Sequence, residues 1–224
     1  MTARENILAR VREGLAAHPA DDLRRARIEE RLRARGRGPA PARASGDQEH
    51  LRALFTEMAR EAGATIDTVC AGEVPQRIAA FLRACNLGPE IRTGHDPFLK
   101  GLAWQRVPEL AVSRGAADAA TATGVSAAAA AAAETGTLVF TSGADNPTTL
   151  NFLPETHIAV IPASRIKATY EDAWDLVRRA HRPATLPRTV NFVTGPSRTA
   201  DIEQTLLVGA HGPGRLHVIV VTGA

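Results

Sequence analysis

The stretch Gly195–Pro213, with the sequence GPSRTADIEQTLLVGAHGP, holds more polar side chains than a turn or a helix cap requires. The guanidinium of Arg198 presents a planar set of donors that suits a carboxylate or a phosphate. The pattern therefore predicts a site for a small anion with Arg198 at its centre. In the competing interpretation, Arg198 pairs with Asp201 or Glu203 and only stiffens the loop. The candidate ligand-binding residues of this stretch are Ser197, Arg198, Thr199, Asp201, Glu203 and His211.

Two strands and a helix are expected to position this stretch. Thr189–Thr194 (TVNFVT) is rich in β-branched residues, which predicts a strand that the following Gly-Pro pair ends. We expect a helix from about Asp201 to Gly209, then a tight turn and the strand Leu216–Val221. Arg198 would then lie at a helix N-terminus, where free amides and the helix dipole favour an anion.

A second polar group, Glu134-Thr135-Gly136, directly precedes the predicted strand Thr137–Thr141. A carboxylate between an alanine run and an apolar strand is expected to be partly buried, so it needs a partner or a raised pKa. Glu134 is therefore a candidate catalytic residue, with Thr135 and Gly136 as candidate ligand contacts. Alternatively, Glu134 accepts backbone hydrogen bonds at the start of the strand. We expect Glu134 and Arg198 at the same edge of the sheet, within about 12 Å of each other.

Three motifs in order carry a resemblance to a known family: Ala133–Phe140 (AETGTLVF), Leu153–Pro162 (LPETHIAVIP) and the stretch Gly195–Pro213. From about Glu5 to the C-terminus the chain resembles the LUD-domain family, in its lactate-utilisation protein C (LutC/YkgG-like) branch. The resemblance implies a NagB/RpiA/CoA-transferase-like fold and a part in oxidising L-lactate to pyruvate beside iron–sulfur partner proteins. By analogy with CoA transferases of that fold group, which use a glutamate beside a glycine, Glu134 is a candidate nucleophile or base.

The composition indicates one α/β domain with an appendage, in a chain of 224 residues of which 44% are hydrophobic. No apolar run approaches the roughly 18 residues of a membrane span, and the charged N-terminus lacks the apolar core of a signal peptide. We therefore expect a cytoplasmic protein. Cys70 and Cys85 are the two cysteines, whereas an all-cysteine iron–sulfur cluster needs four thiolates. We predict no metal or cofactor in this chain. The iron–sulfur clusters that the resemblance implies are expected on partner subunits.

The basic character belongs to residues 1–45, which hold 11 arginines and 6 acids, a net charge of +5. An apolar stripe at helical spacing predicts a first helix, and a second helix with a weaker signal is expected over Asp22–Arg35. Gly36–Gly46 has the composition of a linker, so we expect an arm over 1–45 and a LUD-type domain over 46–224. No aromatic residue interleaves the arginines, which argues against nucleic acid and favours docking on a partner or a second copy. The stripe consists of Ile7, Leu8, Val11 and Leu15.

Helices alternate with short apolar strands from residue 47 onward, which predicts an open, mainly parallel sheet covered by helices. The alanine run Ala127–Ala133 is expected to form a short helix or a tightly packed crossover. Ser142–Leu153 is a candidate rim or lid, although the basic residue common in this loop of the family is missing. His157, at the start of a strand, is interpreted as structural. The expected helices are His50–Ala62, Val74–Ala84 and Tyr170–His181, and the further strands are Thr65–Val69, Glu90–Arg92, Leu110–Ser113, Thr121–Ser126 and His157–Pro162.

Several catalytic motifs are absent from the sequence: GxGxxG after a strand, GxxxxGK[ST], HExxH and GxSxG. A stand-alone NAD-dependent lactate dehydrogenase is thus unsupported. We expect a non-iron–sulfur subunit of an L-lactate oxidation system that binds a small anionic ligand. Two alternatives stay open: an enzyme acting on an acyl or phosphorylated compound through Glu134, and a pure interaction subunit.

Overall fold

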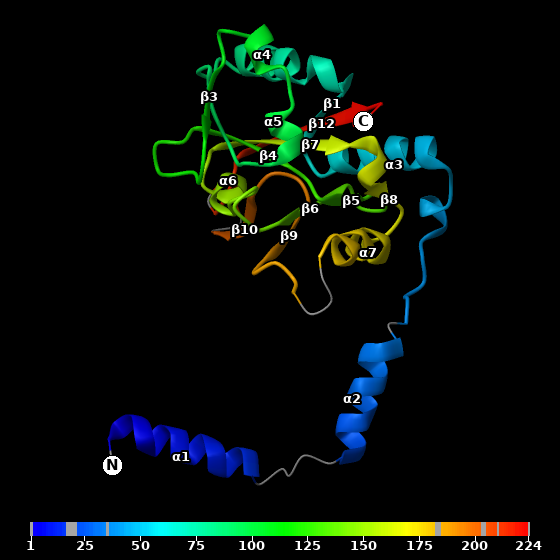
Figure 1. Cartoon of the computed structure of the whole chain (residues 1–224), viewed down its shortest axis with the longest axis vertical. Coiled ribbons are helices and arrows are strands. Elements are labelled where there is room, and N and C mark those ends of the chain that lie inside the picture. The colour runs from blue at the N-terminus through cyan, green and yellow to red at the C-terminus, as the bar shows by residue number, and fades with distance from the viewer. Residues whose placement is uncertain are drawn as a thin grey trace. The chain divides into compact units, whose positions relative to one another are not determined.

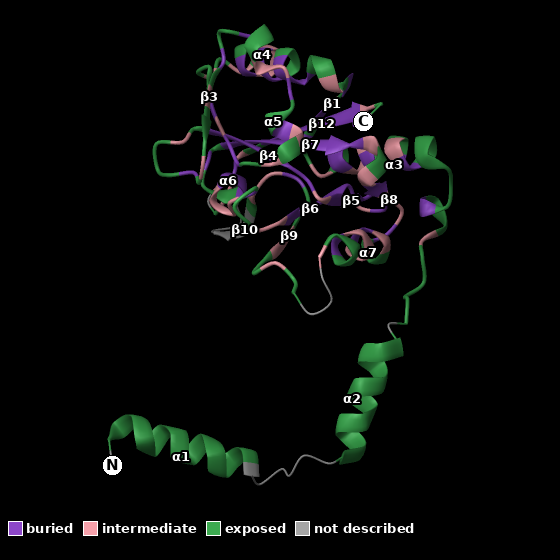
Figure 2. Ribbon diagram, in the orientation of Figure 1, coloured by how far each residue is buried: buried purple, intermediate pink, exposed green. Residues whose placement is uncertain are grey.

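A computed structural model of the chain describes residues 2–16, 22–34, 36–181, 185–202, 205–209 and 211–223. The chain separates into two compact units, Met1–Pro39 and Ala40–Ala224 (Figure 1). The first unit contains the helices α1 (Ala3–Ala16) and α2 (Asp22–Ala34), where the sequence predicts them. Figure 2 colours both helices as exposed, and Leu15 of the apolar stripe is 70% exposed.

The second unit is built on an open sheet of six parallel strands in the order β1-β12-β7-β4-β2-β3. Its central strands β7 and β4 are buried at every residue, as is typical of parallel sheets covered on both faces. The predicted open, mainly parallel α/β sheet is confirmed. The strands are β1 (Thr65–Cys70), β2 (Glu90–Thr93), β3 (Ala111–Arg114), β4 (Thr123–Ala127), β7 (Thr156–Pro162) and β12 (Arg215–Thr222).

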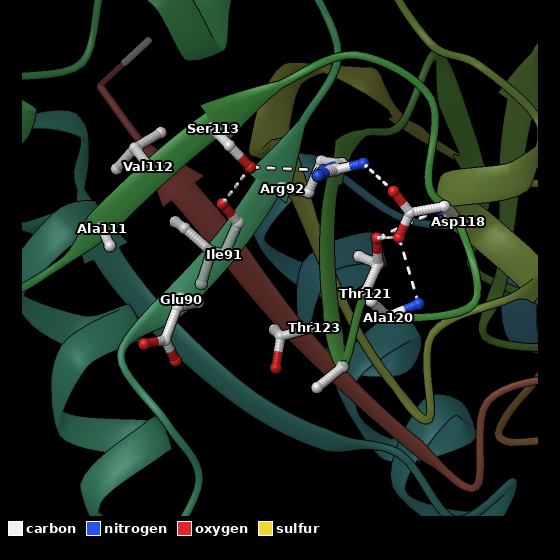
Figure 3. Close-up of a pocket in the computed structure, with 11 residues that line it drawn as sticks. Glu90, Ile91, Arg92, Ala111, Val112, Ser113, Asp118, Ala120, Thr121 and Thr123 are labelled. Atoms are coloured by element: carbon white, nitrogen blue, oxygen red, sulfur yellow. Dashed lines mark hydrogen bonds and ion pairs between the residues drawn. The ribbon is translucent and has the colours of Figure 1, made fainter.

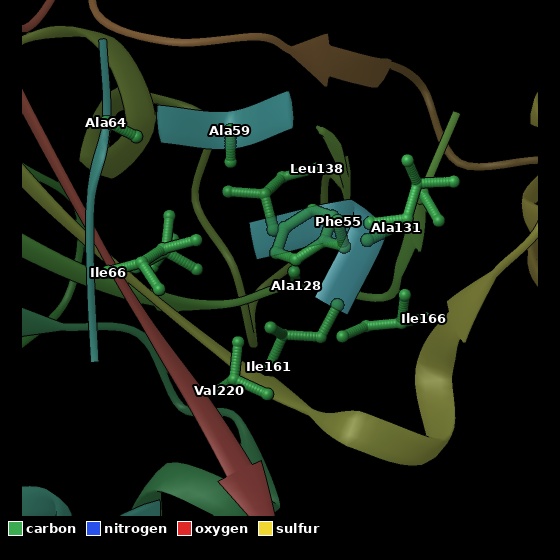
Figure 4. Packing of buried hydrophobic residues seen from close by; sticks show 14 of the residues in the cluster. Phe55, Ala59, Ala64, Ile66, Ala128, Ala131, Leu138, Ile161, Ile166 and Val220 are labelled. Carbon is green, nitrogen blue, oxygen red and sulfur yellow. The ribbon is translucent and has the colours of Figure 1, made fainter. Parts of the chain in front are cut away.

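Helices cover both faces of this sheet. On one face lies α3 (Gln48–Glu61), whose N-cap Asp47 accepts a hydrogen bond from His50 N, and whose Phe55 is fully buried between strands (Figure 4). On the other face lie α4 (Val74–Ala84), with Pro75 in its first turn, and α5 (Pro97–Lys100). Short 3-10 turns connect these elements at η1 (Ala42–Ala44), η2 (Ala71–Glu73) and η3 (Trp104–Arg106).

A second, four-stranded sheet in the order β8-β5-β6-β9 packs against α3. Alternate residues of β5 and β6 face opposite ways: Ala131 and Leu138 face Phe55, whereas Val139 faces α7 (Tyr170–Ala180). Helix η4 (Ala163–Arg165) connects β7 to β8. The strands are β5 (Ala130–Ala132), β6 (Thr137–Thr141), β8 (Ile166–Lys167) and β9 (Val190–Val193).

The alanine run forms the end of β4 and all of β5, so the helical alternative for it is wrong. Ala130, Ala131 and Ala132 are all fully buried, with helices packed on both faces of β5. Strand pairing with β6 and β8 overrides the helix propensity of alanine. The small alanine side chains suit a strand that is packed closely on both faces.

The helix predicted from about Asp201 is also wrong. The segment forms an antiparallel hairpin of β10 (Arg198–Ile202) and β11 (Thr205–Val208), in which Arg198 pairs with Val208. The β-branched residues of this segment stand three apart, which suits one face of a helix, but pairing across the hairpin places them in two strands instead. Arg198 therefore begins a strand, and the helix amides expected beside it are replaced by a hairpin.

No helix in the described part of the chain is long and apolar enough to cross a membrane.

Candidate functional site

A cavity of about 230 Å³ brings together segments that are far apart in the sequence. Its wall includes Ser197 and His211 from the predicted site, and Thr194 at the end of β9. The short helix α6 (Thr149–Phe152) contributes Asn151 and Phe152. His157 and Leu216, near the starts of β7 and β12, complete the inner part of the wall. The cavity thus lies at the amino ends of two central strands.

The backbone holds the Ser197 side of the cavity in place. Ser197 N donates to Pro213 O at 2.9 Å, and Gly209 N donates to Ser197 O at 2.9 Å. Gly195 has φ +71°, and a Cβ at this position would collide with Ala62 O. Only glycine combines this left-handed backbone with so close an approach to α3, which accounts for the Gly-Pro pair after β9.

A buried polar cluster of three side chains includes two residues of the cavity wall, Asn151 and His157. Ser126 Oγ donates to Asn151 Oδ1 at 2.7 Å and lies 2.9 Å from His157 Nε2. The three residues are 0–1% exposed. Because the hydroxyl proton of Ser126 is used on Asn151, His157 Nε2 must be the donor to Ser126 Oγ. Burial lowers the pKa of His157 to about 4, so at neutral pH the ring carries its single proton at Nε2 and Nδ1 is unprotonated.

Thr135 of the second predicted group is connected to this cavity through hydroxyl groups. Thr137 Oγ1 lies 2.7 Å from Thr135 Oγ1, 2.7 Å from Thr194 Oγ1 and 2.8 Å from the hydroxyl of Tyr170. Thr194 lines the cavity. Gly136 has φ +66° and packs against the backbone of Ala59 in α3, so its role is to let β6 begin close to that helix.

Glu134 is 8% exposed, and its contacts are those of a capping residue. Tyr170 N, at the first turn of α7, donates to Glu134 Oε1 at 2.8 Å. The positive end of the helix dipole stabilises a carboxylate there. Arg43 Nη2 donates to the Glu134 carbonyl oxygen at 2.8 Å. The structure thus supplies the backbone hydrogen bond of the competing interpretation, and catalysis by Glu134 stays a prediction.

Arg198 is exposed and its guanidinium lies over Gly63, where a Cβ would collide with it. Within the described part of the chain it forms no ion pair, and no hydrogen bond joins it to Glu134. Thr199 and Asp201 lie in β10, but their side chains are not among those described. Glu203 falls outside the described residues. The proximity of Glu134 and Arg198 stays a prediction.

A larger hollow of about 530 Å³ lies at the edge of the main sheet (Figure 3). It forms because β2 pairs with β4 only at Arg92 and Thr93, so the two strands diverge before that point. Arg92 is already paired with Asp118 at 2.7 Å and donates to Ala116 O at 3.0 Å. Hydrogen bonds from Thr121 and Arg92 lower the pKa of Asp118. Arg92 is thus already paired within the protein and is not free to bind an anion in this hollow. We therefore favour the smaller cavity as the functional site.

Within the described ranges, no three His, Cys, Asp or Glu side chains gather as a metal site would require. Cys70 and Cys85 are both free thiols. His157 was assigned a structural role from sequence, and Ser126 and Asn151 were not recognised as site residues. A histidine at the start of a buried strand was the one signal in the sequence that pointed to this cluster. The other members of the cluster lie in β4 and α6, so they could not be found by spacing.

The LUD domain family model matches residues 40–221. Lactate utilization protein C of Anoxybacillus flavithermus is 43% identical over 90 residues, which are 40% of this chain and 39% of that protein. Lactate utilization protein C of Bacillus subtilis is 38% identical over 100 residues, 44% of this chain and 42% of that protein. The match thus spans about two fifths of the length of these relatives.

A crystal structure of a DUF162 family protein from Deinococcus radiodurans shares the fold, with a TM-score of 0.57 and 24% identity. The similarity covers 79% of this chain and 99% of that one. The family model covers most of the chain, including the segments that form the cavity. The chain therefore belongs to the LUD domain family.

Proposed function

We propose that this chain is a non-iron–sulfur component of an L-lactate utilisation system, in which lactate is oxidised to pyruvate. It binds a small carboxylate in the 230 Å³ cavity, and it works in the cytoplasm as a subunit beside iron–sulfur partner proteins. Membership of the LUD domain family and the names of the lactate utilization protein C relatives support this role.

The observation that carries the proposal is the match between the cavity and a small hydroxy acid. A volume of about 230 Å³ corresponds to roughly seven or eight water molecules, which suits a three-carbon acid better than a dinucleotide. Ser197, His211 and Asn151 bring hydrogen-bonding groups to the wall. No aspartate or glutamate is among the described residues that line it, so no carboxylate there repels an anion.

The role as a subunit follows from the electron balance. Oxidising a 2-hydroxy acid to a 2-oxo acid releases two electrons and two protons. The chain has no dinucleotide fingerprint, and its two cysteines are too few for an all-cysteine cluster. We therefore assign the electron acceptor to iron–sulfur proteins that assemble with this chain.

Calorimetric titration of the full chain with L-lactate, pyruvate and phosphate tests the ligand site. We expect binding of a carboxylate and about tenfold weaker binding in Ser197→Ala, with Ser164→Ala, an exposed serine outside the cavity, as the control. Two substitutions test Arg198, which does not line the cavity: unchanged affinity in Arg198→Ala would mean that Arg198 takes no part in binding, whereas a tenfold loss in Arg198→Lys would mean that its planar donors bind the anion. No heat with any of the three ligands would contradict the proposed binding role.

The partner requirement has a separate test. Lactate-dependent dye reduction should be absent with the purified chain and should appear when the proteins that co-purify with it from its native cell are added. Iron analysis of that co-purified fraction identifies the cluster-carrying subunits. Dye reduction by the chain alone would contradict the role as a subunit.

A further inference from the structure

Two buried polar atoms of residues that line the 230 Å³ cavity have no partner in the described part of the chain. They are Nδ1 of His157 and Nδ2 of Asn151, on side chains that are 0% and 1% exposed. Buried polar atoms in native proteins are almost always hydrogen-bonded, so an unpaired one calls for a group that completes it. Here two of them belong to one cluster in the wall of one cavity.

The two atoms have opposite hydrogen-bonding requirements. Ser126 donates to Asn151 Oδ1, so Asn151 presents only N–H donors at Nδ2. The same serine accepts from His157 Nε2, so His157 presents only a lone pair at Nδ1. Burial lowers the pKa of His157 to about 4, so this lone pair is kept at neutral pH. A ligand that pairs with both atoms carries one hydroxyl donor and one oxygen acceptor.

We propose that His157 and Asn151 are specificity-determining ligand contacts that select a 2-hydroxycarboxylate over the corresponding 2-oxocarboxylate. The hydroxyl group donates to Nδ1 of His157, and a carboxylate oxygen accepts from Nδ2 of Asn151. Ser126 is a positioning residue, because it sets the tautomer of one contact and the amide orientation of the other. The inference rests on the proposed function, since it places the ligand in the same cavity.

The discrimination has a simple physical origin. A 2-oxo acid has a carbonyl oxygen where the hydroxy acid has its hydroxyl, so it would bring an acceptor to the lone pair of Nδ1. That leaves two acceptors facing each other in a buried site, and a site built to pair with a hydroxyl strongly rejects an analogue without it. The arrangement holds the substrate of the oxidation more tightly than its product, which favours product release.

The test compares L-lactate with pyruvate by calorimetry at pH 7 on the full chain and two variants. We expect the wild type to prefer lactate by at least about tenfold. In His157→Gln the amide nitrogen takes the place of Nε2 and keeps a donor for Ser126, but the Nδ1 lone pair is lost. Lactate affinity should fall by about tenfold or more, and the preference should vanish. His157→Asn can place its amide oxygen, an acceptor, at the position of Nδ1. Part of the preference for lactate should then return.

The outcomes separate this inference from the proposed function. Equal wild-type affinities for the two acids, or an undiminished preference in His157→Gln, would overturn the assignment and leave the carboxylate site standing. No binding of either acid to the wild type would overturn both. If the variants fail to fold, nitrogen NMR of histidine-labelled wild type decides: lactate must shift the Nδ1 resonance of His157 and pyruvate must shift it less. An Nδ1 resonance that lactate leaves unchanged would overturn the assignment.

Discussion

Nε2 of His157 lies 2.9 Å from Oγ of Ser126, with both side chains almost completely buried. This contact joins β7 to β4 across the main sheet, and the hydrogen bond from Ser126 to Asn151 extends it to α6. A strand histidine, a strand serine and a helix asparagine thus form one polar unit inside an otherwise apolar face. The hydrogen bonds within this unit leave Nδ1 of His157 and Nδ2 of Asn151 as the atoms without a partner among the described residues.

Replacing Ser126 with alanine should destabilise the domain by about 1–3 kcal/mol, because Asn151 Oδ1 and His157 Nε2 would both lose their partner. Urea denaturation measures the change in the free energy of unfolding. The exposed Ser164→Ala is the matched control and should change stability by less than about 0.5 kcal/mol. Equal effects of the two substitutions would show that the buried cluster contributes nothing to stability.

Stability should fall as the pH drops from about 7 towards 4. Burial lowers the pKa of His157 from 6.5 to about 4, so below pH 6.5 the unfolded state binds a proton that the native state does not. The loss from His157 is on the order of 3 kcal/mol by pH 4, where it levels off. The pKa of His217 is also lowered to about 4 by burial and Arg77, while Asp67 opposes the shift.

The pH dependence can be assigned by difference. Urea denaturation of the wild type and of His157→Gln between pH 4 and pH 7 should give curves that converge as the pH falls, because the variant lacks the titrating group. His217→Phe tests the second histidine in the same way. Parallel curves for the wild type and His157→Gln would mean that His157 titrates alike in the native and unfolded states.

Gly136→Ala should destabilise the domain by at least about 2 kcal/mol, because it adds left-handed strain at φ +66° to a collision with the backbone of Ala59. Gly72→Ala is the control, since nothing lies within 4 Å of a Cβ at that position, and it should change stability by less than about 0.5 kcal/mol. Thermal unfolding followed by circular dichroism measures both. Similar melting temperatures of the two variants would contradict the proposed close packing of Gly136 on α3.

Glu134→Gln should leave stability within about 1 kcal/mol of the wild type, because the amide oxygen can still accept from Tyr170 N. Glu134→Ala removes that acceptor from the start of α7 and should cost about 1 kcal/mol. We also expect Glu134→Gln to bind ligand as the wild type does. If it folds normally but loses turnover in the assembled lactate-oxidising system, the alternative of an enzyme that uses Glu134 as nucleophile or base gains direct support.

Deleting residues 1–39 should preserve a cooperative thermal transition while changing the oligomeric state or partner binding, because the compact unit begins at Ala40. Deleting residues 1–46 should lower stability further, since Ala44 is 5% exposed in the core and Arg43 binds the Glu134 carbonyl oxygen. Circular dichroism and light scattering measure the two effects. An unfolded 40–224 fragment would show that the arm is part of the folding unit, and an unchanged assembly would contradict its docking role.

The sequence by itself determined the elements whose signals are local. Helix α4 begins and ends at Val74 and Ala84 as predicted, because a proline in its first turn and an apolar stripe specify it. Strand β6 likewise matches the predicted Thr137–Thr141. The alternation of such elements was enough to predict a parallel α/β sheet, since parallel strands need helical crossovers.

Only the tertiary structure decided the segments whose partners are distant. The alanine run adopts an extended strand conformation because β6, β8, α3 and α7 enclose it. The segment that begins at Arg198 forms a hairpin because its two halves pair with each other. The same holds for the cavity: Ser126, Asn151, His157 and Ser197 come from four elements or loops, and no local spacing relates them. Hydrogen-bond partners and burial depend on the whole fold, so the unpaired nitrogens of His157 and Asn151 become visible only once that fold is known.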